Sequence, residues 1–70
     1  MKPVGVAIAG CGTISHQYFT TLAARPEVQI IACADIDVDR AAKVALDHAV
    51  PVHGDVATVL AHPDVELVVN

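Results

Sequence analysis

The feature that most constrains the fold is a glycine-rich turn at residues 10–15, with the sequence Gly-Cys-Gly-Thr-Ile-Ser. It follows an unbroken apolar run at residues 4–9, which is typical of a strand buried on both faces of a parallel sheet. Gly10 permits a tight exit from that strand, and Gly12, without a Cβ, lets the backbone lie against a pyrophosphate. Ser15 takes the third place of the G-x-G-x-x-G/A pattern, near the start of a helix whose N–H groups favour phosphate. The turn predicts a dinucleotide site formed by Gly10, Cys11, Gly12, Thr13 and Ile14.

An acidic residue after the second apolar run supports this interpretation. The run at residues 28–34 ends at Asp35, about 20 residues after Ser15, where the ribose-binding acid of such sites is expected. The Asp35 carboxylate can accept hydrogen bonds from both ribose hydroxyls, which predicts NAD as the cofactor and NADP as the alternative. Arg40 follows in the first turn of the next helix. It could lie over the adenine, reach a 2′-phosphate or be an exposed helix residue, and the sequence leaves these possibilities open.

The rest of the chain alternates between strand and helix patterns. Strands are predicted at residues 4–9, 28–34, 51–53 and 65–69, and helices at 13–24, at 38–48 and briefly after residue 55. Asp37 and Asp55 are predicted N-caps because each directly precedes an apolar-periodic run. The residues predicted to face the core are Ile14, Tyr18 and Leu22 in the first helix, Ala41, Val44, Ala45 and His48 in the second, and Val56, Val59 and Leu60 in the third.

This order of elements predicts an α/β fold with a doubly wound parallel sheet in the strand order 3-2-1-4. Seventy residues are too few to complete such a sheet. We therefore expect residues 1–70 to be the N-terminal part of a dinucleotide-binding domain, with the remainder of the protein absent.

Composition excludes several classes of function. The net charge is −4 with four basic residues, which argues against a nucleic-acid surface. The apolar runs are short and interrupted, so no membrane span is predicted. The first strand follows the N-terminus too closely to leave room for a signal peptide, which suggests a cytoplasmic protein. Cys11 and Cys33 are expected to be reduced thiols, and no metal site is predicted because the histidines lack ligand spacing.

Three segments resemble the amino-terminal end of the Gfo/Idh/MocA family of NAD(P)-dependent oxidoreductases. They are Val6 to Ile14, then Ala34 to Asp37 with Arg40 and Ala41, and the His62 to Val69 segment, which is similar to the family's D-P-D-V-D-A-V-I. The chain departs from the family in two places. Tyr18 replaces a histidine common in the first helix, and His48-Ala49-Val50 replaces the usual glycine turn after the second.

The resemblance implies a larger enzyme with a second α/β domain that holds the substrate. It implies hydride transfer between the nicotinamide and a sugar, inositol, diol or similar hydroxyl or carbonyl carbon, and a homo-oligomer when full length. The family's catalytic Lys, Asp and His would all lie outside residues 1–70, so no catalytic residue is assigned and this piece alone is predicted to be inactive. The alternative is a non-catalytic nucleotide-sensing module, because the fold does not decide between the two.

Overall fold

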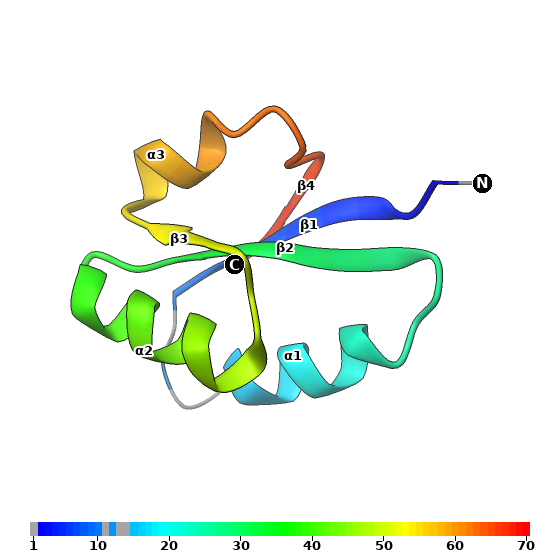
Figure 1. The fold of residues 1–70 in the computed structure, drawn as a ribbon, viewed down its shortest axis with the longest axis horizontal. Coiled ribbons are helices and arrows are strands. Elements are labelled where there is room, and N and C mark those ends of the chain that lie inside the picture. Colours follow the sequence, from blue (N-terminus) through cyan, green and yellow to red (C-terminus); the bar gives the residue numbers. More distant parts are fainter. Residues whose placement is uncertain (1, 11, 13–14) are drawn as a thin grey trace.

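The computed structural model describes residues 2–10, 12 and 15–70. Its parallel sheet has the strand order β3-β2-β1-β4. The strands are β1 (Val4–Ala9), β2 (Val28–Ala34), β3 (Val52–Gly54) and β4 (Leu67–Val69), and the helices are α1 (Ser15–Ala23), α2 (Val38–His48) and α3 (Val56–Leu60). Helices α1 and α2 cover one face of the sheet and α3 lies over the other (Figure 1). The predicted fold class and strand order are confirmed.

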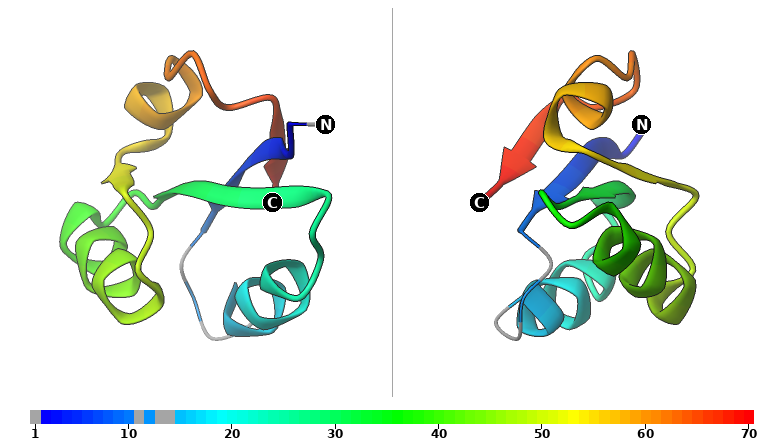
Figure 2. Two further views of the ribbon diagram at one scale, coloured as in Figure 1. Left: turned by 45° about the vertical axis from the view of Figure 1, so that its right-hand side comes forward. Right: turned by 90° about the vertical axis from the view of Figure 1, so that its left-hand side faces the viewer.

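The central strand β1 pairs with β2 on one side and with β4 on the other, and β4 lies at the edge of the sheet (Figure 2). The β1–β2 register shifts once, because Val6 pairs with Ile30 whereas Ala7 pairs with Ala32. Ile31 is therefore an extra residue in β2, an irregularity of the kind that locally increases strand twist.

The side chains of β1 and β2 contribute to two apolar clusters, one on each face of the sheet. Because helices cover both faces, these strands are apolar without alternation, as their sequences predicted. The cluster beneath α1 and α2 consists of Val6, Ile8, Phe19, Cys33, Ala41, Val44, Ala45 and Val50. The cluster beneath α3 consists of Ala7, Ile31, Ala32, Ala34 and Val59.

The predicted inward face of α1 is wrong at Tyr18. Tyr18 is 41% exposed, whereas the neighbouring Phe19 is 2% exposed and belongs to the core, with Leu22 packed against it. Both aromatic residues are spaced to align with Leu22, at i+4 and i+3, so periodicity alone does not separate them. Phe19 has no hydroxyl to hydrate, which favours its burial over that of Tyr18. Ile14, the third predicted member, lies outside the described residues.

Helix α2 begins and ends as the sequence predicted. The Asp37 carboxylate caps its first turn by accepting hydrogen bonds from the backbone N–H groups of Asp39 and Arg40. Of the predicted core residues of this helix, Ala41, Val44 and Ala45 are buried and His48 is partly buried. His48, in the last turn, stacks on Phe19 of α1 with ring centroids 4.3 Å apart. Ala49 then ends the helix in the left-handed conformation (φ 56°, ψ 42°), which is the conformation that usually selects glycine.

The third helix and the strands around it differ in detail from the prediction. Val59 of α3 is 1% exposed, but Val56 and Leu60 are 37% and 50% exposed, so their predicted burial is wrong. A helix of one and a half turns presents too little surface for three residues to reach the sheet. Strand β4 begins at Leu67 rather than residue 65, because the two preceding residues make turn and side-chain contacts. Strand β3 is shifted by one residue, to Val52–Gly54.

Candidate functional site

Gly10, which begins the turn after β1, has a backbone conformation that favours glycine. Gly10 has φ +89°, a value that L-residues with side chains rarely adopt. Its N–H donates to the carbonyl of Ala34 at 2.8 Å, which ties the start of the turn to the end of β2. The turn therefore begins at the carboxyl end of the sheet, between β2 and β4, where ligands of doubly wound folds bind. Cys11, Thr13 and Ile14 lie outside the described residues.

Gly12 borders open space. A Cβ built on Gly12 meets no heavy atom of the described residues within 4 Å, and the same is true of Gly10. Packing within the described part of the chain therefore does not require glycine at position 12. A ligand backed against the main chain at this point would require it, because a side chain would occupy the ligand's space.

Asp35 lies at the end of β2, beside the turn. Its backbone N–H donates to the carbonyl of Gly54, and its Oδ1 accepts a hydrogen bond from the backbone N–H of Asp37 at 2.9 Å. Its side chain is 12% exposed. The carboxylate is thus held in one place by the strand and by the loop that follows it.

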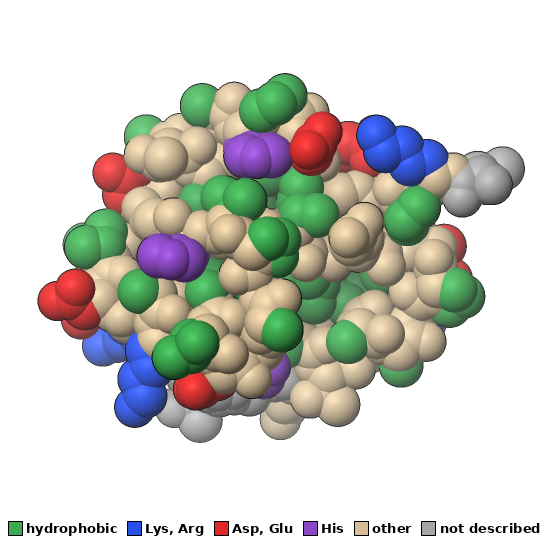
Figure 3. Space-filling view, viewed as in Figure 1, with side chains coloured by type: hydrophobic (Ala, Val, Ile, Leu, Met, Phe, Trp, Pro, Cys, Tyr) green, Lys and Arg blue, Asp and Glu red, His purple; other side chains and the backbone are tan. Residues whose placement is uncertain are grey.

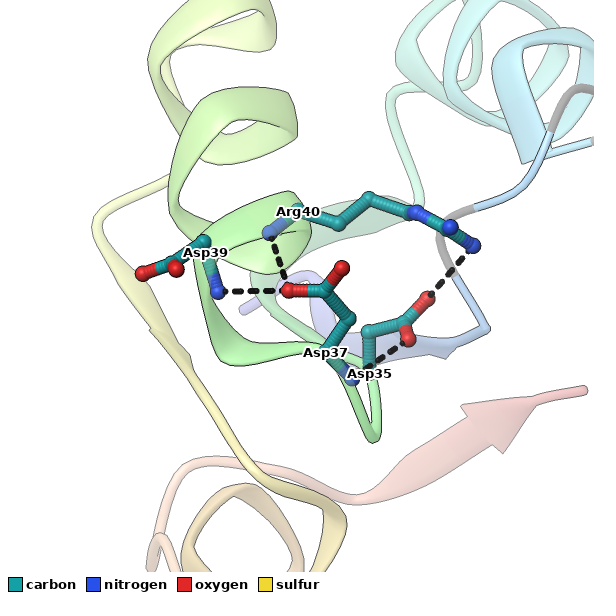
Figure 4. A network of polar contacts seen from close by, with 4 residues as sticks. All are labelled: Asp35, Asp37, Asp39 and Arg40. Carbon is teal, nitrogen blue, oxygen red and sulfur yellow. Dashed lines mark hydrogen bonds and ion pairs between the residues drawn. The ribbon is translucent and has the colours of Figure 1, made fainter.

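Arg40 approaches the same carboxylate from the first turn of α2. The Arg40 Nη1 atom lies 4.0 Å from Asp35 Oδ2, and the Arg40 side chain is 54% exposed (Figure 4). The structure therefore places the Arg40 side chain, from the first turn of α2, beside the Asp35 carboxylate at the end of β2. An open glycine turn and a positioned carboxylate on adjacent strands are compatible with a dinucleotide.

The other singled-out acids are helix caps. Asp37 caps α2, and Asp55 caps α3 by accepting a hydrogen bond from the Thr58 N–H at 2.7 Å. That backbone hydrogen bond, with a second one from the Thr58 side chain, lowers the pKa of Asp55 below its usual value.

His62 and Cys33 make hydrogen bonds within the protein. His62 follows α3, and its Nδ1 accepts a hydrogen bond from the Asp64 N–H at 3.1 Å. The Cys33 thiol is buried and donates to the Ala41 carbonyl at 3.4 Å. Among the residues that the structure describes, no group of three or more His, Cys, Asp or Glu side chains could hold a metal ion. No helix in this part of the chain has both the length and the apolar character that a bilayer crossing needs.

Sequence reasoning missed a contact at the opposite end of β1. The Gly5 N–H donates to Glu66 Oε2 at 2.8 Å, and the Glu66 N–H donates to the Gly5 carbonyl at 2.9 Å. A Cβ on Gly5 would overlap the carbonyl oxygen of Asp64. The available signal was a glycine inside a buried strand, which often marks close approach of another backbone segment.

The family model described as "Oxidoreductase family, NAD-binding Rossmann fold" matches residues 4–69. The chain belongs to the Gfo/Idh/MocA family. The predicted family, fold and class of cofactor are thereby confirmed. No curated protein sequence matches the chain at a significant level.

Solved structures of this family share the fold. KijD10, a 3-ketoreductase from Actinomadura kijaniata in complex with NADP and TDP-benzene, has a TM-score of 0.86 at 25% identity over 96% of this chain and 21% of its own. GenD2 from gentamicin A biosynthesis, in complex with NAD, has a TM-score of 0.82 at 24% identity over 100% of this chain and 21% of its own. A putative myo-inositol dehydrogenase from Sinorhizobium meliloti 1021 has a TM-score of 0.81 at 18% identity, over 93% and 20%. The chain spans about a fifth of the length of these relatives.

Proposed function

We propose that the full-length protein is an NAD(P)-dependent oxidoreductase and that residues 1–70 supply part of its nucleotide site. The observation that carries this proposal is the open glycine turn at the end of β1, next to a positioned carboxylate at the end of β2. Adjacent parallel strands bring both features to the same edge of the sheet, where a dinucleotide extends from its pyrophosphate to its adenosine ribose.

Each proposed ligand residue has a separate task. The backbone of Gly10, Cys11, Gly12, Thr13 and Ile14 surrounds the pyrophosphate, and the N-terminus of α1 favours its negative charge. Asp35 accepts hydrogen bonds from the ribose hydroxyls. Arg40 contacts the adenosine end of the cofactor. These residues bind and orient the cofactor, and none of them is assigned a proton-transfer step.

The bound nicotinamide supplies the hydride chemistry. We propose that the hydride passes to or from a hydroxyl or carbonyl carbon of a sugar, inositol, diol or related small molecule. The solved relatives support this class, because they include a 3-ketoreductase and a putative myo-inositol dehydrogenase. Catalytic residues are assigned to the part of the protein beyond residues 1–70. We propose a cytoplasmic homo-oligomer, in line with the resemblance.

NAD is the proposed preferred cofactor. The Asp35 carboxylate offers two oxygen atoms to the vicinal ribose hydroxyls, and it is held in place by a hydrogen bond from the Asp37 N–H. The 2′-phosphate of NADP replaces one of those donors and brings a second anion toward the carboxylate. A preference of about 1.4 kcal/mol is already tenfold in affinity.

The proposal is tested with Gly12→Val in the full-length protein. We expect the substitution to abolish NAD binding in a calorimetric titration, because the new side chain would fill the space where the pyrophosphate meets the backbone. Circular dichroism should show an unchanged fold, since nothing in the described protein lies within 4 Å of the added Cβ. Unchanged affinity would contradict the proposal. Wild-type binding without turnover on a polyol panel would favour the nucleotide-sensing module instead.

A further inference from the structure

Strand β2 contains one residue more than the part of β1 that it pairs with. Val6 of β1 pairs with Ile30. Ala7, the next residue of β1, pairs with Ala32, so Ile31 lies between two paired positions. Successive side chains of a regular strand point to opposite faces of the sheet, but Ile31 and Ala32 both belong to the apolar cluster beneath α3. The residues after Ile31 therefore face the side opposite to the one that regular pairing would give them.

This inversion decides which side of the sheet the carboxylate of Asp35 faces. Cys33 packs in the cluster beneath α1 and α2, and Ala34 packs in the cluster beneath α3. Asp35 follows on the side of α1 and α2, where its Oδ2 lies 4.0 Å from Nη1 of Arg40 in the first turn of α2 (Figure 4). If the same sequence paired regularly with β1, Asp35 would face the side of α3 instead.

The register shift also decides how far along the sheet Asp35 lies. Ala9 pairs with Ala34, and the Gly10 N–H donates to the Ala34 carbonyl at 2.8 Å. Gly10 and Asp35 directly follow the two strands, so the glycine turn and the carboxylate begin at the same level. Under regular pairing, Ala9 would lie opposite Cys33, and Asp35 would lie one residue, about 3.3 Å, farther along the sheet. A displacement of that size would break a hydrogen bond to a ligand held by the turn.

We infer that the register shift at Ile31 positions Asp35 for the nucleotide, by turning its carboxylate to the side of α2 and holding it level with the glycine turn. This inference rests on the proposed function. Ile31 itself is assigned no contact with the cofactor, because its side chain is 8% exposed and packs beneath α3. It acts through the pairing of the residues that follow it, Ala32 to Ala34, with β1. Extra residues of this kind are common next to functional sites, where they re-aim a side chain.

Changes in the length of β2 separate this pairing from the side chains that make it. Deletion of Ile31 removes the extra residue, so every remaining residue of β2 keeps its present partner and Asp35 keeps its side and its level. Deletion of Ala32 has the same result, because Ile31 then pairs with Ala7 and stays beneath α3. One alanine inserted between Ala34 and Asp35 leaves the pairing of β2 unchanged but moves the carboxylate to the opposite side and one residue farther.

The test compares the dissociation constant for NAD, measured by calorimetry, with the urea-unfolding midpoint of the full-length protein. Both deletions should lower the midpoint, because they disturb the core beneath α3, but should change the dissociation constant by less than about threefold. Ile31→Ala is the matched control, since it removes the same side chain and keeps the residue, and it should behave like the deletion of Ile31. The insertion should weaken NAD binding by about tenfold or more, as Asp35→Ser should, because the charged acceptor is lost to the ribose. Its midpoint should lie closer to that of the wild type than those of the deletions do.

The outcomes separate the inference from the proposed function. An insertion that binds NAD as tightly as the wild type would overturn the inference, and so would a folded deletion that loses NAD binding as the insertion does. Failure of both deletions to fold, with Ile31→Ala folded, would also overturn it, because β2 could then not pair regularly. The insertion decides alone if Ile31→Ala does not fold. If the wild type does not bind NAD, the proposed function itself fails.

Discussion

The two ends of β1 use glycine for opposite reasons. At the amino end, Gly5 is buried, its would-be Cβ coincides with the Asp64 carbonyl oxygen, and both of its backbone groups are bonded to Glu66. Just after the carboxyl end, a Cβ added at Gly10 or Gly12 would meet no described residue within 4 Å. Gly5 lets two parts of the chain touch, whereas Gly10 and Gly12 are the positions where we propose that a ligand binds.

This contrast suggests different tasks for the two ends of β1, with stability depending on the amino end and proposed nucleotide binding on the carboxyl end. The amino end also borders a hollow of ≈ 440 Å³ between the starts of β1, β2 and β3 and the segment before β4, partly lined by Ile31 and Val52. In Figure 3 apolar side chains show across the middle of one face of the molecule, and charged ones gather toward its margins. We therefore expect substitutions at the amino end to change the free energy of unfolding and those at the carboxyl end to change nucleotide affinity.

The largest expected effect is that of Gly5→Ala. The new methyl would overlap backbone rather than a flexible side chain, so β1 and the segment before β4 must separate. Overpacking of this kind costs typically about 1–3 kcal/mol, and we expect the upper end or beyond. Gly12→Ala, the matched control, should change stability by less than about 0.5 kcal/mol. Urea unfolding measures both, and equal losses in the two variants would remove the distinction between the ends.

Glu66→Ala should cost about 2 kcal/mol, because it leaves the buried N–H of Gly5 without its carboxylate partner. Glu66→Gln should cost less, since its amide oxygen can still accept that hydrogen bond. Glu27→Ala is the control, because the Glu27 carboxylate pairs with Arg25 at 3.4 Å with both side chains more than half exposed. A loss in Glu66→Ala no greater than that in Glu27→Ala would show that the contact contributes no stability.

Ala49→Gly should have a smaller effect than Gly5→Ala and Glu66→Ala, and one of opposite sign. We expect it to stabilise the protein by roughly 0.5–1 kcal/mol. Ala49 ends α2 at the amino end of the sheet with φ 56°, where a Cβ is unfavourable, and the residue is exposed, so no buried contact is lost. Thermal or urea unfolding would measure the gain. Destabilisation would mean that the entropy that glycine adds to the unfolded chain outweighs the relief of backbone strain.

The smallest expected effect lies at the carboxyl end and depends on pH. Because the hydrogen bonds from Thr58 lower the pKa of Asp55 in the folded state, its carboxylate stabilises α3 fully at neutral pH. This contribution is lost as the pH falls below the usual carboxyl range and through the lowered pKa. Asp55→Asn, which does not titrate, should be less stable than wild type at neutral pH, and the gap should close in acid. A gap of constant size from neutral to acid pH would contradict this account.

Local signals in the sequence predicted most of the fold. Strands β1 and β2 were found at their observed bounds because both are buried on two faces and are apolar throughout. Helix α2 was found because its cap, Asp37, is adjacent in sequence to the groups that it bonds. The prediction that Tyr18 faces the core was wrong, because burial depends on how α1 is rotated against the sheet and the helical spacing of Tyr18 does not specify that rotation.

The sequence predicted where the residues of the candidate site lie, but not the side-chain contacts around them. Gly10, Gly12 and Asp35 lie at strand ends, so the order of strands was enough to bring them together. The pairing of Arg40 with Asp35 depends on side-chain conformation, which the sequence left open. The contact between Gly5 and Glu66 joins residues far apart in the chain, and no local pattern marks Glu66 as a partner. The predicted ligand roles of Gly10, Cys11, Gly12, Thr13, Ile14, Asp35 and Arg40 stay predictions.

The contact between Gly5 and Glu66 also bears on the order in which the chain folds. It joins residues 61 positions apart, whereas the pairing of β1 with β2 already begins between Val4 and Val28. Each doubling of a closed loop adds about 0.6 kcal/mol of entropic cost, and non-local strand pairing slows folding. We therefore expect β4 to dock against a β1–β2 pair that has already formed. The contact between Gly5 and Glu66 would then be among the last that β1 makes.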